Sequence, residues 1–308
     1  MFEIIFLGTS ASAPSIQRGL SAQIIKHDEY RFLVDCGEGT QRQILKSGLG
    51  FKRFNRILLT HGHLDHILGL GGLLSTLVRW EALEELEIFG SPRTLERVHD
   101  LLYGVVLRGA NPTTQLYLRE IKPGVIFETE NFSVSSFSVS HRGPGCLGYK
   151  FEEKPHRPFL SDKADLLGVP FGPERKDLVQ GKSITLANGS RIEPDDVLGS
   201  AMDGASLVIT GDTGKTDNLL EICKGLDTLV IESTYIKADA EMARKFGHLT
   251  AQQAGELAKQ AGVTRLILTH LSRRYRERDV LREARAIFPN SHVARDFDTY
   301  KIKREENE

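Results

Sequence analysis

Short apolar runs of strand length open the chain and return along most of it. The first three lie at residues 2–7, 20–25 and 31–34 and are rich in Ile, Leu, Val and Phe. The polar turn between the second and third runs predicts a β-hairpin. Segments of helical periodicity separate the later runs, and this mixture predicts an α/β fold.

Apolar residues at helical spacing predict several helices between the strands. Residues 40–46 form the first, which should end before Gly48, and Pro92 opens another that reaches about residue 108. Thr250 is a good N-cap for a helix that ends near residue 261. The remaining predicted helices are 67–80 and 238–246, and the remaining predicted strands are 86–89, 116–121, 132–139, 206–210, 229–231 and 265–269.

One segment, residues 152–199, has no periodic pattern. Five prolines and several glycines interrupt it, and charges of both signs fill the gaps. We expect one domain over residues 1–308, with this segment inserted as a protruding, flexible arm. A disordered surface insertion is the alternative that composition alone leaves open.

Two strand-like strings nearly repeat within the sequence. Residues 56–61 read RILLTH and residues 265–270 read RLILTH, while residues 33–35 and 207–209 form a second similar pair. These matches favour a duplicated unit whose two sheets pack face to face with helices outside. Chance similarity between two apolar strands is the alternative.

Four candidate metal ligands fall within six positions after the apolar run at 57–59. They are His61, His63, Asp65 and His66. Side chains at i and i+2 point to opposite faces of a strand, so the four converge only if the chain turns, which Gly62 permits. Three imidazoles and a carboxylate favour a divalent metal of zinc type over a merely polar loop.

Further candidate ligands follow other strands by one to three residues. These residues are His141, Asp212, Glu232 and His270. Residues at the carboxyl ends of neighbouring strands meet along one edge of a sheet, where open α/β sheets place their sites. The number of ligands suggests two metal ions.

Composition and charge limit the cellular compartment and the kinds of partner that we expect, but they do not identify the reaction. The net charge of −1 gives no global field for a polyanion, so a nucleic-acid substrate would need local patches. Cys36, Cys146 and Cys223 are widely spaced, without a C-x-x-C pair, and we expect them to be packing residues rather than disulfides or zinc ligands. No apolar run is long enough to span a bilayer, so we expect a cytoplasmic protein without a membrane partner.

With these residues located, the chain resembles the ribonuclease Z family, the tRNA 3'-processing endonucleases of the metallo-β-lactamase superfamily. The resemblance covers nearly the whole chain. It rests on FLGT near the start, VDCGEGT at 34–40, THGHLDH at 60–66, TGDT at 210–213, IEST at 231–234, HLT at 248–250 and LTH at 268–270. It implies an αββα metallo-β-lactamase sandwich, and similarity to the short form of the family implies a homodimer.

The resemblance also implies roles for the candidate residues. One zinc ion would be held by His61, His63 and His141, the other by Asp65, His66 and His270, with Asp212 between them. Asp65 would accept a proton from the attacking water, and His248, oriented by Glu232, would donate one to the leaving oxygen. Mn²⁺ is the alternative metal. Glu232 could instead be a buried capping acid and His248 a helix-flanking residue, while Asp35 and Glu38 could either support ligating histidines or cap a helix.

Several residues are candidates for binding precursor tRNA. Arg273, Arg274, Tyr275 and Arg276 offer charge and a stacking ring close to His270, although Glu277 and Asp279 would also suit a solvated helix start. In the arm, the family resemblance singles out Gly172 and Pro173. The family's P-x-K-x-R-N loop reads PSIQRG here, so Arg18 is present while the Lys and Asn are not.

Two other functions compete with cleavage of the 3' trailer of precursor tRNA. A small-molecule phosphodiesterase or thioester hydrolase could use the same dinuclear scaffold, but the 71 residues from His141 to Asp212 (212 − 141) are more than a small substrate requires. A metal-stabilised RNA-binding protein without turnover would tolerate loss of Asp65 or His248.

Overall fold

The computed structural model describes residues 1–110 and 112–304; positions 111 and 305–308 of the predicted 1–308 domain lie outside the described residues. The chain divides into two compact units. The first comprises Met1–Glu152 and the chain from Ala205 onward, and the second is Glu153–Gly204. The second unit overlaps the segment expected to form an arm.

The first of two seven-stranded sheets in this unit has the order β16-β1-β2-β3-β4-β5-β6 and combines six strands from the N-terminal part of the chain with β16 from residues 299–302. β1 to β3 pair antiparallel, as the hairpin prediction required, and β3 to β6 pair parallel. The strands are β1 (Phe2–Gly8), β2 (Ala22–His27), β3 (Tyr30–Val34), β4 (Arg56–Leu58), β5 (Glu85–Gly90), β6 (Gln115–Glu120) and β16 (Thr299–Ile302).

The rest of the first unit builds a second seven-stranded sheet in the order β15-β14-β13-β12-β9-β8-β7. β12 to β15 pair parallel, and β9 pairs antiparallel with β12. The strands are β7 (Gly124–Glu128), β8 (Phe132–Ser138), β9 (Leu147–Glu153), β12 (Ser206–Ile209), β13 (Thr228–Glu232), β14 (Arg265–Thr269) and β15 (Ser291–Val293). The sequence pattern did not reveal β7, β9 or β15.

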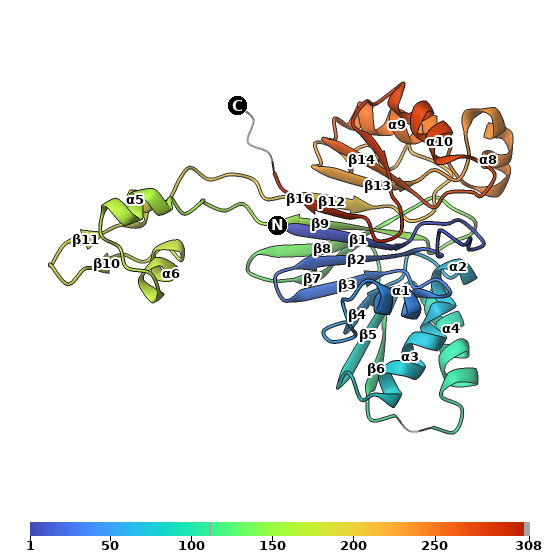
Figure 1. Ribbon diagram of the computed structural model, residues 1–308, viewed down its shortest axis with the longest axis horizontal. Helices are drawn as coiled ribbons and strands as arrows, with labels where there is room; N and C mark the ends of the chain where they lie inside the picture. Colours follow the sequence, from blue (N-terminus) through green and yellow to red (C-terminus); the bar gives the residue numbers. More distant parts are fainter. Residues whose placement is uncertain (111, 305–308) are drawn as a thin grey trace. The chain divides into compact units, whose positions relative to one another are not determined.

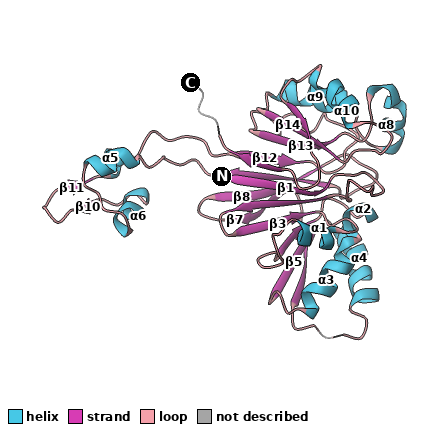
Figure 2. Ribbon diagram, viewed as in Figure 1, coloured by secondary structure: helices cyan, strands magenta, loops and turns pink. Residues whose placement is uncertain are grey.

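The two sheets pack face to face (Figure 2). Aromatic side chains form much of the core between them. Phe2 of the first sheet meets Phe132 of the second edge to face, with ring centroids 5.7 Å apart. Phe32 and Phe151 repeat this contact at 5.6 Å. Burial of these rings on both inner faces fixes the strand register, because a slip of one residue would turn them outward.

Helices cover the outer face of each sheet (Figure 1). Leu73 and Leu77 of α3 pack on the first sheet, and Leu257 of α9 packs on the second. The helices are α1 (Thr40–Lys46), α2 (Leu64–Ile67), α3 (Gly69–Arg79), α4 (Pro92–Leu101), the π-helical turn η1 (Leu102–Val106), the 3₁₀ turn η2 (Lys237–Asp239), α8 (Ala240–Phe246), α9 (Ala251–Ala261) and α10 (Glu277–Arg285). Among the described residues no helix has the length and apolar character needed to cross a membrane.

The second unit has secondary structure and a small core of its own. Ala164, Val169, Leu178, Ile192 and Val197 are buried together. Its elements are α5 (Ser161–Leu166), α6 (Pro173–Val179), β10 (Ile184–Thr185), β11 (Arg191–Ile192) and α7 (Pro194–Val197). The disordered-insertion alternative for this segment is therefore wrong.

The strand order supports only part of the proposed internal repeat. β3 and β12 each follow an antiparallel neighbour and begin a row of four parallel strands, so residues 33–35 and 207–209 hold equivalent places. β4 lies next to β3, whereas β13 separates β14 from β12. The predicted equivalence of residues 56–61 and 265–270 is therefore wrong, and that similarity comes from two buried strands of similar composition.

Candidate metal centre

The loop after β4 gathers the first ligands because the strand ends where the polar residues begin. His61 lies in this loop, and His63 is the N-cap of α2, with extended backbone angles (φ −70°, ψ 151°). α2 then carries Asp65 and His66 on its first turn. Gly62 allows the loop to pass α4, since a Cβ atom at this position would lie 3.3 Å from Cδ of Arg97.

The structure brings all seven sequence-predicted ligands together. Three overlapping groups could hold an ion: His61, His63, His141 and Asp212 form the first, Asp65, His66 and His270 the second, and Asp212, His248 and His270 the third. Within each group the candidate ligand atoms lie within 4.8 Å of one another. The first two groups correspond to the two ligand sets that the family resemblance implied, and the third shares Asp212 and His270 with them.

Asp212 lies between the first two groups. Its Oδ2 is 3.8 Å from Nε2 of His61 in the first group and 3.5 Å from Nε2 of His66 in the second. Its Oδ1 is 3.4 Å from Nε2 of His270. A single carboxylate thus faces ligands of both sets, which is the geometry that a bridging ligand needs.

Several histidines have the ring nitrogen that points away from the centre hydrogen-bonded to the protein. Nδ1 of His66 donates to Asp35 Oδ2 over 2.8 Å, and Nδ1 of His141 donates to the Gly247 carbonyl over 2.6 Å. Such partners fix the ring orientation and tautomer, leaving Nε2 for a metal. His63 differs, because its Nδ1 faces the centre, 2.8 Å from Nε2 of His61.

The alternatives for Asp35 and Glu38 resolve differently for the two residues. Asp35 supports a ligand: besides binding His66 it accepts hydrogen bonds from the Thr60 amide and hydroxyl. Its backbone is left-handed (φ 59°), as is that of His270 (φ 55°). Glu38 is exposed, and the N-cap of α1 is Gly39, without a side-chain capping bond. The left-handed backbone of Asp35 and His270 is a strained conformation, and such strain concentrates at functional sites.

The charges at the centre depend on burial and on one another. Burial lowers the pKa of His63 to about 4, assisted by His141. Burial would raise the pKa of Asp212, but the adjacent His270 and His66 hold it well below its usual range. Burial also lowers the pKa of His61 and His141, so these imidazoles and that of His63 are neutral, and Asp212 is ionised, as metal ligation requires. His66 differs, because the Asp212 and Asp35 carboxylates outweigh the effect of burial and raise its pKa well above the usual value.

Orphaned polar atoms show that this donor set fits metal ions. Nε2 of His66 and Oδ1 of Asp212 are buried and have no hydrogen-bond partner among the described residues. Leaving such atoms unpaired costs about 1 to 3 kcal/mol each, so a ligand is expected there. The mixture of imidazole nitrogens and carboxylate oxygens suits a divalent transition metal, and zinc in particular.

Glu232 and His248 form a pair next to the ligands. His248 Nδ1 donates to Glu232 Oε1 over 2.8 Å, and Glu232 is 1% exposed. Glu232 also accepts hydrogen bonds from the Leu249 amide and the Thr234 hydroxyl, so it is a buried acid that both organises its loop and contacts His248. Burial lowers the pKa of His248, but the Glu232 carboxylate outweighs this effect and raises the pKa to about 9.

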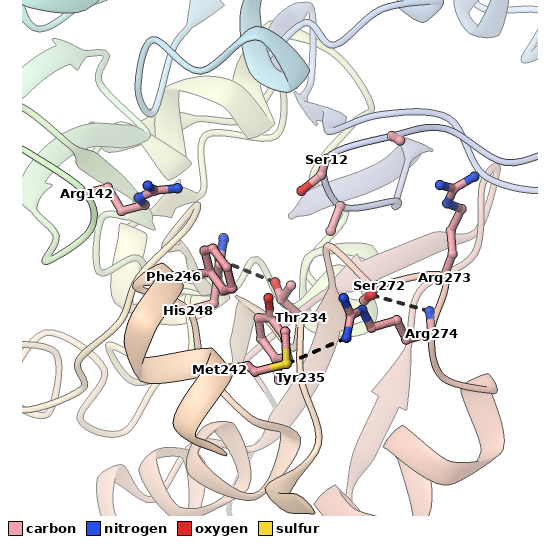
Figure 3. A pocket seen from close by; sticks show the side chains of 12 residues that line it. Ser12, Arg142, Thr234, Tyr235, Met242, Phe246, His248, Ser272, Arg273 and Arg274 are labelled. Carbon is pink, nitrogen blue, oxygen red and sulfur yellow. Dashed lines mark hydrogen bonds between the residues drawn. The ribbon is translucent and has the colours of Figure 1, made fainter. Parts of the chain in front are cut away.

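A pocket of about 600 Å³ opens beside His248 (Figure 3). Arg142, Arg273 and Arg274 provide positive charge around it, and Tyr235 and Phe246 provide rings. Ser12 closes another part of its wall, and the Ser12 amide donates to Asp65 Oδ2 over 2.9 Å. The combination of cations and aromatic rings is suited to a nucleotide.

Comparison with known proteins identifies the family. A family model described as Anti-Pycsar protein Apyc1 matches residues 2–155, and one described as Beta-lactamase superfamily domain matches residues 177–271. Ribonuclease Z of Bradyrhizobium sp. (strain ORS 278) is 45% identical over 302 residues, which cover 98% of this chain and 100% of that protein. The chain belongs to the ribonuclease Z family.

Other members of the family agree with this assignment. Ribonuclease Z of Methanothermobacter thermautotrophicus is 37% identical, with 98% of this chain and 97% of that protein covered. The crystal structure of human tRNase Z, short form, superposes with a TM-score of 0.68 at 25% identity, covering 97% of this chain and 99% of that one. The fold is therefore the expected αββα metallo-β-lactamase sandwich.

The four residues at 273–276 do not all line one pocket. Arg273 and Arg274 line the pocket beside His248. Tyr275 is turned away, and its hydroxyl donates to Asp239, while Arg276 is the N-cap of α10. The rings at the pocket come instead from Tyr235 and Phe246, which sequence reasoning missed because neither lies within a recognised motif.

Arg18 lies in the loop at residues 14–19, whose sequence departs from the family's P-x-K-x-R-N pattern. Its side chain contacts other parts of the protein. Its guanidinium donates to the Thr9 hydroxyl, to the Ala294 carbonyl over 2.6 Å and to Glu277 over 3.0 Å. These contacts fasten the loop 14–19 to the C-terminal part of the first unit. In the second unit Gly172 adopts φ +133° as the N-cap of α6, and Pro173 is the first residue of that helix.

Proposed function

We propose that this chain is an endoribonuclease that removes the 3' trailer from precursor tRNA by metal-assisted hydrolysis, leaving a 3'-hydroxyl on the tRNA. The observation that carries the proposal is the meeting of seven ligand side chains with the Glu232–His248 pair in a chain of the ribonuclease Z family. The chain's likeness to relatives named ribonuclease Z favours this function over a small-molecule hydrolase.

Two Zn²⁺ ions, with Mn²⁺ as the alternative, would occupy the centre. His61, His63 and His141 would hold one ion and Asp65, His66 and His270 the other, with Asp212 shared. When bound, such ions lower the pKa of water and neutralise charge on phosphoryl oxygens. The protein contributes the fixed orientation of the histidine rings and the burial that excludes bulk solvent.

Asp65 and His248 divide the proton transfers. The His270 and His66 side chains overcome the effect of burial and hold the pKa of Asp65 below its usual range, so this carboxylate is ionised and can accept a proton from the attacking water. The Ser12 amide fixes its Oδ2. His248, held through Nδ1 by Glu232, keeps Nε2 free to donate a proton to the leaving oxygen.

The identity of the leaving oxygen decides which nucleotide lies in the pocket. Cleavage that leaves a 3'-hydroxyl on the tRNA makes the departing atom the O3' of the last tRNA nucleotide. Because His248 protonates that atom, this nucleotide occupies the pocket that His248 lines. Arg273 and Arg274 would bind phosphates there, and Tyr235 or Phe246 would stack on a base.

A homodimer and a cytoplasmic location complete the proposal. Both follow from the family resemblance and from the substrate, and the second unit with Gly172 and Pro173 would bind the body of the tRNA. Light scattering of the purified protein tests the dimer, since one subunit has a mass of 34.3 kDa.

Mapping the cut on a 3'-extended precursor tRNA tests the function. We expect one cut between the acceptor end and the trailer, with a 3'-hydroxyl on the tRNA and a 5'-phosphate on the trailer. Absence of cleavage by metal-replete protein, or cleavage within the tRNA body, would overturn the proposal. An RNA-binding protein without turnover predicts the first of these results.

A further inference from the structure

The first turns of α4 lie against the two loops that carry His61, His63 and His141. Arg97 Nη1 donates to the Gly62 carbonyl over 2.6 Å, between His61 and His63. On the other loop, a Cβ atom on Gly145 would lie 2.7 Å from the Ser91 hydroxyl oxygen. The start of this helix therefore has a fixed place directly beside the metal centre.

Two arginines on one face of α4 point toward these loops. Arg93 and Arg97 are one helical turn apart, and Arg93 Nη1 lies 3.4 Å from where a Cβ of Gly143 would be. Both side chains are exposed, and neither forms an ion pair with a carboxylate among the residues that the structure describes. The single hydrogen bond of Arg97 leaves most of its five N–H donors free.

The proposed function gives the RNA strand a direction across the centre. The last tRNA nucleotide lies in the pocket beside His248, which includes Met242 and Phe246 of α8. The trailer must then leave from the other side of the scissile phosphate. Figure 1 shows α8 and α4 on opposite flanks of the strand ends, with α2 between them.

We propose that Arg93 and Arg97 form a binding site for the backbone phosphates of the first trailer nucleotides. The site rests on the proposed function and adds a contact for the part of the substrate that is discarded. Arginine suits this role because its planar group makes bidentate hydrogen bonds to phosphate. No base is read, so the site accepts trailers of any sequence.

Two carboxylates lie beside the arginines on the same face of α4. Glu96 follows Arg93, and Asp100 follows Arg97, by three residues, and both acids are exposed. Neither acid forms an ion pair with these arginines among the described residues, so both guanidinium groups keep donors for a phosphate.

Steady-state cleavage of two precursors that share one tRNA body tests the proposal. One precursor has a trailer of a single nucleotide and the other a trailer of about six nucleotides. In Arg93→Ala/Arg97→Ala we expect KM to rise about tenfold for the long trailer and to stay within twofold for the short one. The slope of log KM against log salt for the long trailer should fall by about 1.4, which is two contacts at about 0.7 each.

Three controls separate the possible causes. Arg282→Ala on α10 removes an exposed arginine elsewhere and should behave like the parent protein. Metal content and inhibition by mature tRNA, which has no trailer, should be unchanged in the double variant. Arg93→Ala, which leaves the bond from Arg97 to Gly62 intact, should show part of the same trailer-dependent effect.

Each contrary result overturns the proposal. Equal loss on both precursors would place the arginines against the tRNA body, and loss of metal would show that they only support the ligand loop. An unchanged KM for the long trailer would show that the trailer does not contact them. If the parent protein cleaves neither precursor, the proposed function itself fails, which is a distinct outcome.

Discussion

Glu232 Oε1 and His248 Nδ1 lie 2.8 Å apart, joining the end of β13 to the loop before α9. The carboxylate is held in turn by the Thr213 amide, over 2.8 Å, and by the Thr234 hydroxyl. Because these donors fix Glu232, the imidazole has one orientation, with Nε2 free. Orientation of this kind is needed by a group that protonates a leaving oxygen.

His248→Ala should therefore affect only substrates whose leaving group needs a proton. We expect cleavage of precursor tRNA to slow by a factor of about 10² to 10⁴. Hydrolysis of an aryl phosphodiester, whose nitrophenolate leaves without protonation, should change less than threefold. The two rates are measured on the same preparation at saturating metal.

Asp65→Asn provides the contrast, because the role proposed for its carboxylate, accepting a proton from the attacking water, is needed with every substrate. Both activities should fall together in that variant. If His248→Ala also lost aryl phosphodiester activity, or if it kept tRNA cleavage, His248 would not be the proton donor.

The number of bound metal ions should depend on which ligand group a substitution alters. We expect two ions for each chain of the parent protein and one for His141→Ala, which removes a ligand of the first group only. Asp212→Ala should lose more than His141→Ala, because Asp212 faces both groups. Atomic emission on dialysed protein measures the content.

A chelator should also lower the thermal stability of the parent protein, because ions that bind only the folded state stabilise it by mass action. A melting temperature that did not respond to the chelator, in protein that had contained metal, would contradict this account.

Two glycines of α3 should respond in opposite ways to alanine. A Cβ atom on Gly69 would lie 2.0 Å from the Gly37 carbonyl oxygen, so Gly69→Ala must displace the loop that carries Asp35. We expect a loss of several kcal/mol of unfolding free energy, of the size found for overpacked cores. The nearest atom to a Cβ on Gly71 is 3.4 Å away, so Gly71→Ala should stabilise by about 0.5 to 1 kcal/mol. Urea denaturation of both variants makes the comparison.

The cysteines should be inert until the protein unfolds. Burial raises the pKa of Cys36 and of Cys223 to about 12 and that of Cys146 to about 11. Since only the thiolate reacts with a disulfide reagent, no thiol should react rapidly at pH 8. Three should react in denaturant. Rapid reaction of one thiol in the folded protein would show that its burial is incomplete.

Sequence patterns predicted those parts of the molecule that local chemistry determines. The bounds of α1 were predicted as observed because its apolar positions are periodic and Gly48, at φ +73°, ends it. The ligand residues after β4 could be identified because chance seldom places three histidines within six positions.

Other features depend on contacts that no local pattern records. Asp35 follows its strand like several other acids, and only the fold brings it to His66. Gly247 supports His141 through a carbonyl, which every residue possesses. β7 was missed because most of its side chains are exposed or half-buried, so it lacks the apolar alternation of a buried strand.

The second unit should be dispensable for chemistry but needed for tRNA. β9 and β12 are antiparallel neighbours with Glu152 opposite Ser206. Replacing Glu153–Gly204 by Asn-Gly therefore leaves a three-residue loop, Asn-Gly-Ala205, which can join the strands as a hairpin. The three cores of the first unit contain no residue of the deleted segment. We expect aryl phosphodiester hydrolysis to persist within about threefold, because the ligand set and His248 all remain. Cleavage of precursor tRNA should fall at least a hundredfold, through weaker binding of the tRNA body. A variant that retained full tRNA cleavage would show that the second unit does not bind the substrate, whereas loss of both activities with normal metal content would show that it helps to shape the centre.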